Sequence, residues 1–142
     1  VVDPQNLGAL LRSAYFLGQQ RVGILVCSKN SAPPTPVVSA ASAGALEVLT
    51  VHSTTNLPRS LSQAKEDGFR IIGASSFINM DEDVLYDLHD LPTTSTDDRP
   101  IVLVLGSEGH GLRTLVAKAC TEFVRIPAEQ QQQHRTTMRI VM

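Results

Sequence analysis

The sequence contains no tryptophan, and only 4% of its residues are aromatic. This scarcity argues against a carbohydrate site or a single-strand-binding surface built from many stacked rings. The two cysteines, Cys27 and Cys120, match no metal-ligand spacing, and we expect two reduced thiols in an intracellular protein. No apolar run reaches the length of a membrane-spanning helix, so we expect no membrane partner. The chain opens abruptly at Val1 and reads as a fragment, so the lack of a visible targeting peptide says nothing about its destination.

The sequence also lacks a strong charge of either sign, since its formal net charge is −2. Domains that bind nucleic acids usually carry a basic excess, so this value is a weak argument against that class. A nucleic-acid binder with this net charge would need its lysines and arginines gathered on one face, or positive charge supplied by another segment or a second subunit.

The chain is rich in short apolar runs that alternate with amphipathic segments. With 142 residues it is long enough for one domain with a real core. Strands are predicted at residues 21–27, 47–51, 70–74, 101–105 and 123–126, and helices at residues 3–18, 37–45, 57–67 and 111–120. The run at 101–105 is the clearest candidate for a central strand. Residues 79–100 read as a long polar surface connection, with a short helical piece as an alternative within it. This alternation predicts an α/β fold with a mostly parallel sheet flanked by helices.

A first cluster of polar residues lies on the first predicted helix, which Asp3 can cap and which Pro4 can begin. Gly8 and Arg12 are four residues apart and are expected to share a face outside the leucine stripe. Glycine in a helix costs about 1 kcal/mol relative to alanine, so its presence suggests that something approaches the backbone closely. The alternative is an ordinary exposed arginine on a polar helix face.

A second cluster follows the run at 101–105 and has the sequence Gly106-Ser107-Glu108-Gly109-His110-Gly111. A glycine-rich loop at the carboxyl end of a parallel strand lets a ligand contact the backbone. The loop is neither a P-loop nor a dinucleotide fingerprint, because the glycine spacing differs from both, and a simple turn is the alternative. Glu108 would be costly to bury without a cation or donor, for which Arg12 is a candidate.

Together these clusters resemble conserved motifs of one enzyme family, the SpoU (TrmH-type) RNA ribose 2′-O-methyltransferases of the SPOUT superfamily. Residues 6–14 resemble the first motif of that family, residues 105–112 the second, and residues 124–127 the opening of the third. Residues 30–39 and 42–47 further resemble the mitochondrial members, which methylate a guanosine ribose in large-subunit rRNA.

The resemblance implies a set of site residues and a cofactor, S-adenosylmethionine, with no metal. The implied cofactor-binding residues are Gly106, Ser107, Glu108, Gly109, Gly111, Ile126 and Pro127. The implied catalytic residues are Arg12, at the ribose 2′-hydroxyl, with Asn6 and Glu108 in support. The resemblance also implies rRNA as the substrate, a homodimer in the complete enzyme, and a mitochondrial location or another compartment that contains rRNA.

The third motif breaks off after Pro127, and a glutamine-rich segment follows. We therefore expect residues 1–127 to be a methyltransferase domain truncated within the third motif, and residues 128–142 to be an unrelated, disordered tail. The C-terminal trefoil knot of the SPOUT fold would then be incomplete. The sequence supports a methyltransferase acting on rRNA. It leaves open a non-catalytic RNA- or partner-binding remnant, and a nucleotide-binding regulator that uses only residues 106–111.

Overall fold

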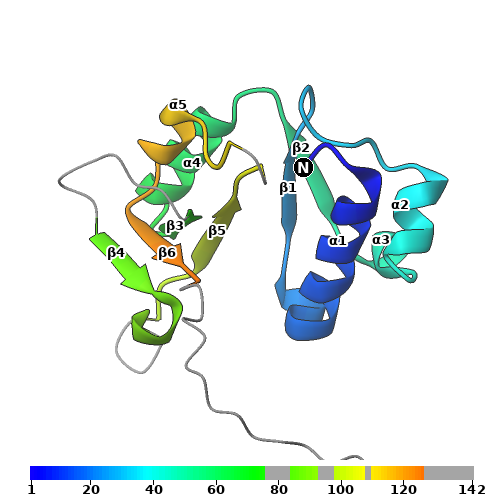
Figure 1. Ribbon diagram of the computed structural model, residues 1–142, viewed down its shortest axis with the longest axis horizontal. Helices are drawn as coiled ribbons and strands as arrows, with labels where there is room; N and C mark the ends of the chain where they lie inside the picture. Colours follow the sequence, from blue (N-terminus) through cyan, green and yellow to red (C-terminus); the bar gives the residue numbers. More distant parts are fainter. Residues whose placement is uncertain (76–83, 93–97, 108–109, 127–142) are drawn as a thin grey trace, which may run out of the picture.

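The computed structural model describes residues 1–75, 84–92, 98–107 and 110–126, apart from the side chain of Gln20. Its named strands form two sheets, and within each sheet every pair of neighbouring strands is parallel (Figure 1). Helices flank both sheets, which confirms the predicted α/β class. The described helices and strands fall into two halves, each built around its own sheet. The elements that pack extensively against each other belong to the same half.

The N-terminal half contains a two-stranded sheet in which Ile24 lies opposite Val51. Its elements are α1 (Pro4–Gly18), a 3-10 turn (Gln19–Arg21), β1 (Ile24–Cys27), α2 (Pro36–Ala41), α3 (Ala45–Val48) and β2 (Val51–Thr54). α1 begins as predicted, because the Asp3 carboxylate accepts a hydrogen bond from the Gln5 amide at 2.8 Å and Pro4 occupies the first turn.

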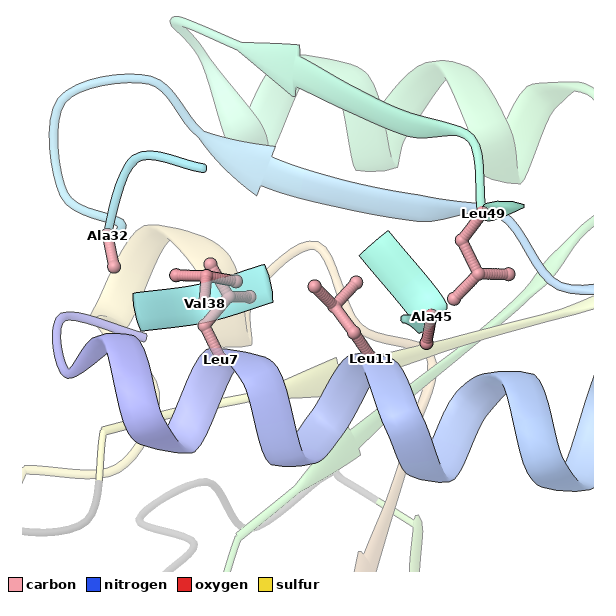
Figure 2. Packing of buried hydrophobic residues seen from close by; sticks show 6 residues of the cluster. All are labelled: Leu7, Leu11, Ala32, Val38, Ala45 and Leu49. Atoms are coloured by element: carbon pink, nitrogen blue, oxygen red, sulfur yellow. The ribbon is translucent and has the colours of Figure 1, made fainter. Parts of the chain in front are cut away.

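The core of this half lies between α1 and the short helices α2 and α3. Leu7 and Leu11 point from α1 toward these helices, where they meet Val38, Ala45 and Leu49 (Figure 2). The residues that resemble the mitochondrial members therefore contribute to this core. The predicted strand at 47–51 was placed too early, because Glu47 belongs to α3 and the strand begins only at Val51.

The C-terminal half contains a four-stranded sheet of order β4-β6-β3-β5. Its elements are α4 (Leu57–Glu66), β3 (Arg70–Ala74), β4 (Val84–Asp87), a 3-10 turn (Leu88–Asp90), β5 (Ile101–Leu105), α5 (Thr114–Ala117) and β6 (Glu122–Arg125). α4 and α5 supply Leu61 and Val116 to a core that they share with Ile71, Val104 and Phe123.

The prediction that residues 101–105 form a central strand is wrong in the described structure, where β5 lies at the edge of its sheet. Ile101, Leu103 and Leu105 are 44%, 57% and 44% exposed, whereas Val104 is buried. Side chains alternate between the two faces of a strand, so one apolar face of β5 is open to solvent. β3 is central instead, and it is buried over most of its length.

Two further predictions need correction. The polar segment 79–100 contains β4, which the sequence pattern did not indicate. This strand depends on contacts with a distant segment, since it is held to β6 by backbone pairing and by an ion pair between Asp87 and Arg125. The helix predicted at 111–120 shrinks to Thr114–Ala117, since the first residues of that segment close the preceding loop.

Gly8 has a structural role that differs from the predicted one. It is buried together with Leu7 and Leu11, and a Cβ atom built on Gly8 would lie 2.4 Å from the Cβ of Ala41. The close approach inferred from this glycine is therefore the packing of α2 on α1. Gly8 is buried under α2, whereas Arg12, one turn further along α1, is exposed.

Gly8→Ala is expected to destabilise the protein by about 1–3 kcal/mol, because the added methyl group overpacks the α1–α2 contact. This cost outweighs the helix propensity that alanine gains, about 1 kcal/mol. Ser13→Ala is the control, since Ser13 lies on the same helix and is exposed. Urea unfolding of both variants measures the difference. Equal stabilities would mean that α2 moves away from α1 at no cost.

Candidate functional site

The carboxyl ends of β3, β5 and β6 lie at the same edge of the C-terminal sheet, because the three strands are parallel neighbours. Ser75, Gly106 and Ile126 are the residues that follow these strands. The Ser75 amide donates a hydrogen bond to the Val124 carbonyl at 3.1 Å, which ties the ends of β3 and β6 together. The edge therefore gathers the second and third motifs, as expected of a ligand site in a parallel sheet.

The loop after β5 is closed by its own backbone. The Ser107 amide donates to the Gly111 carbonyl at 3.0 Å, and the Gly111 amide donates to the Ser107 carbonyl at 2.8 Å. A Cβ atom on Gly106 would lie 2.3 Å from the carbonyl carbon of Gly111, and Gly111 has a φ of +61°. Both glycines are thus needed to form the loop. Glu108 and Gly109 lie outside the described residues.

The closed loop is anchored over the end of β3. A Cβ atom on Gly73 would lie 2.8 Å from a terminal methyl of Leu112, so the glycine makes room for the residue that follows the loop. The Ser75 hydroxyl would lie 3.8 Å from a Cβ atom on Gly111. Sequence reasoning missed Ser75, although its position directly after a buried strand could have indicated it.

Gly106→Ala is expected to open the loop, because its methyl group would occupy the space of the Gly111 carbonyl. The hydrogen-exchange protection of the Ser107 and Gly111 amides should fall at least tenfold, whereas α4 should remain protected. Gly23→Ala is the matched control, since no atom lies within 4 Å of a Cβ atom built there. Unchanged protection of the two loop amides in Gly106→Ala would contradict this role.

Charged residues flank the edge beside Ile126. Arg125, the last residue of β6, donates a hydrogen bond from Nε to the Asp87 carboxylate. This hydrogen bond lowers the pKa of Asp87 and raises the pKa of Arg125. Arg125 is therefore engaged with β4, while the neighbouring Ile126 is 79% exposed at the edge. Pro127, also expected at the cofactor, lies outside the described residues.

Asn6 and Arg12 lie in the other half of the structure, on the exposed surface of α1. The start of α1 is tied to the segment after β1, because the Ala32 amide donates to the Val1 carbonyl at 2.8 Å. The extensive contacts among described elements do not link α1 to the loop of Gly106. The structure thus brings together Gly106, Ser107, Gly111 and Ile126, and the convergence of Arg12 and Asn6 on them stays a prediction.

In the part of the chain that is described, no three His, Cys, Asp or Glu side chains gather as a metal ion would require. Across those same ranges, no helix combines the length and apolar composition needed to span a bilayer.

Comparison with known sequences places this arrangement among RNA methyltransferases. The SpoU rRNA Methylase family model matches residues 1–133. The mitochondrial rRNA methyltransferase 1 of Schizosaccharomyces pombe is 41% identical over 127 residues, which cover 89% of this chain and 41% of that protein. The human mitochondrial rRNA methyltransferase 1 is 37% identical over 135 residues, covering 92% of this chain and 37% of its own length. The chain thus spans well under half of the length of these two relatives.

A bacterial relative and two solved structures extend the comparison. The 23S rRNA (guanosine-2′-O-)-methyltransferase of Vibrio parahaemolyticus is 33% identical over 127 residues, covering 89% of this chain and 47% of that one. A Porphyromonas gingivalis structure assigned to the TrmH family of RNA methyltransferases superimposes with a TM-score of 0.76 at 30% identity, over 94% of this chain and 49% of its own. The SpoU methyltransferase AviRb of Streptomyces viridochromogenes, in complex with AdoMet, shares the fold with a TM-score of 0.72 at 22% identity, over 92% and 47% of the two chains.

These matches include both motif regions, and they confirm the resemblance first indicated by residues 6–14 and 105–112. The chain belongs to the SpoU rRNA Methylase family.

Proposed function

We propose that the protein to which this chain belongs transfers a methyl group from S-adenosylmethionine to a ribose 2′-hydroxyl of ribosomal RNA, with guanosine as the target nucleoside. The family match over residues 1–133 carries this proposal. The names of the yeast, human and Vibrio relatives support rRNA, and the Vibrio name supports the guanosine 2′-oxygen. The mitochondrial names support a mitochondrial location, and a homodimer is proposed from the family resemblance alone.

The described residues fit one wall of a cofactor site. Gly106, Ser107 and Gly111 present a closed backbone loop at the edge where parallel strands receive ligands. Ile126 offers an exposed apolar side chain at the same edge. These residues would hold the adenosine and methionine portions of S-adenosylmethionine, and Glu108, Gly109 and Pro127 are proposed to complete this part of the site.

When bound, S-adenosylmethionine supplies an electrophilic methyl group on a sulfonium, so the reaction needs no metal to activate the methyl donor. Arg12 is proposed to lie beside the ribose 2′-oxygen, where its positive charge would stabilise the negative charge that develops as this oxygen passes its proton to solvent water and attacks. Its guanidinium would also hold the adjoining phosphate, which orients the nucleophile. Asn6 and Glu108 would position Arg12 and the ribose.

One observation favours a second candidate, a non-catalytic RNA- or partner-binding remnant. After Pro127 the sequence continues with Ala128, Glu129 and a run of glutamines, where the family's third motif would continue. If that segment does not complete the site, the chain retains the loop of Gly106 without the opposite wall.

Calorimetry with S-adenosylmethionine separates the two candidates. The 142-residue chain is expected to bind the cofactor weakly or not at all, because a half-formed site must order its loops on binding, at about 1–2 kcal/mol per residue fixed. A chimera in which residues 128–142 are replaced by the corresponding segment of the Schizosaccharomyces pombe relative is expected to bind with micromolar affinity.

Gly106→Ala in the chimera is the control, since it opens the proposed wall. Micromolar affinity in the original chain would show that residues 128–142 complete the site. Absence of binding in a folded chimera would contradict the proposed methyltransferase.

A further inference from the structure

The C-terminal part of α1 carries large apolar side chains on its surface. Phe16 is 82% exposed and Tyr15 is 41% exposed. A shallow hollow beside them is lined by Tyr15, Phe16, Gln19 and Arg21. A phenylalanine this exposed contributes little to the core, so its ring is available to a partner.

The segment that carries this surface contains basic and no acidic residues. Residues 4–46 contain Arg12, Arg21 and Lys29 and no Asp or Glu, although the whole chain has a net charge of −2. Arg12 and Arg21 are exposed, and within the described residues neither forms an ion pair. This segment is therefore net positive, although it carries only three of the chain's 12 lysines and arginines.

Helix geometry places the aromatic and basic groups side by side. Arg12, Phe16 and Gln19 follow one another at spacings of four and three residues, so they lie along one face of α1. α1 ends where the Gln19 amide donates to the Tyr15 carbonyl, and the chain then turns so that Arg21 lines the hollow with Phe16.

We propose that this surface, formed by Tyr15, Phe16, Gln19 and Arg21, binds a single-stranded stretch of the RNA substrate that adjoins the target nucleotide. An unpaired base stacks on the ring of Phe16, and Arg21 contacts a phosphate beside it. The proposal rests on the proposed function, because the strand that continues from a ribose at Arg12 would run along the same helix face.

Fluorescence tests the proposal directly, because the chain has no tryptophan and Phe16→Trp introduces a single reporter. The 142-residue chain is titrated with a 12-nucleotide oligoadenylate at low salt. Phe16→Trp is expected to retain affinity, and its emission should be quenched as the base stacks. Leu17→Trp is the matched control: Leu17 is 81% exposed but points away from the line of Arg12 and Phe16, so its emission should change little.

Binding measurements give a second readout. Phe16→Ala should weaken binding about five- to tenfold, at the lower end of what stacking of one base supplies, and Leu17→Ala should bind as the original chain does. Arg21→Gln should lower the slope of log affinity against log salt by about 0.7, the value for one phosphate contact on a single strand.

Three results would overturn the proposal: no binding of the oligonucleotide by the original chain, equal affinity of Phe16→Ala and the original chain, or Phe16→Trp emission that responds to protein concentration and not to RNA. The last result would assign the surface to a second copy of the chain. Cofactor binding by the chimera is measured separately, so a failure here is distinguishable from a failure of the proposed methyltransferase.

Discussion

Arg12→Ala is expected to lower methyl transfer by a factor of about 10²–10³ or more in a chimera with the third motif restored. The loss should fall on the chemical step, because the variant removes a positive charge beside the developing negative charge on the ribose oxygen. The fold should be unaffected, since Arg12 is exposed on α1 and contributes nothing to the cluster of Leu7 and Leu11. Incorporation of labelled methyl groups into rRNA measures the effect.

Conservative and remote variants sharpen the test. Arg12→Lys should also lose most of the activity, because an ammonium lacks the planar pair of donors that a guanidinium offers to a phosphate. Arg59→Ala removes an exposed arginine from α4, in the other half, and should leave the rate unchanged. Cofactor binding should be retained in all three variants. A rate near that of the parent chimera in Arg12→Ala would rule out the proposed role.

Glu122→Ala is expected to destabilise the protein by about 3–5 kcal/mol, the usual cost of breaking a buried ion pair. Arg70 Nε lies 2.9 Å from Glu122 Oε1, and its Nη2 lies 2.5 Å from Oε2, so the pair is bidentate. The side chains are only 3% and 15% exposed. Removal of the carboxylate leaves a buried guanidinium, which still donates a hydrogen bond from Nη1 to the Pro92 carbonyl at 3.2 Å.

Two comparisons distinguish this ion pair from a general effect of charge removal. The double variant Arg70→Met, Glu122→Leu should be clearly more stable than Glu122→Ala, since both charges of the buried pair are replaced together by apolar side chains. Asp87→Ala breaks the exposed pair with Arg125 and should have a far smaller effect, because solvent screens that pair. Urea unfolding measures all three. Equal losses in Glu122→Ala and Asp87→Ala would show that the Arg70 pair contributes no more than a surface pair.

Several features of the protein were predictable because their signals are local. Asp3 and Pro4 mark the start of α1, since a cap and a fixed φ act within one turn. The strands at 70–74 and 101–105 were predicted with their observed bounds, because short runs of branched apolar residues favour extended backbone. The loop of Gly106 was predicted as a glycine-rich turn after a strand, and its order relative to Asn6 and Arg12 identified the family.

Other features depend on contacts between residues far apart in the chain. Nothing near Gly8 in the sequence indicates that Ala41 packs against it, and nothing near Arg70 indicates a partner 52 residues away at Glu122. The edge position of β5 follows from which strands pair with β3, and β4 is stabilised by β6 despite its polar surroundings. Local sequence therefore determined the start of α1, the strands at 70–74 and 101–105, and the glycine loop. Only tertiary packing decided the strand order, the buried ion pair and the exposure of Phe16, because each depends on what lies across a face of the element.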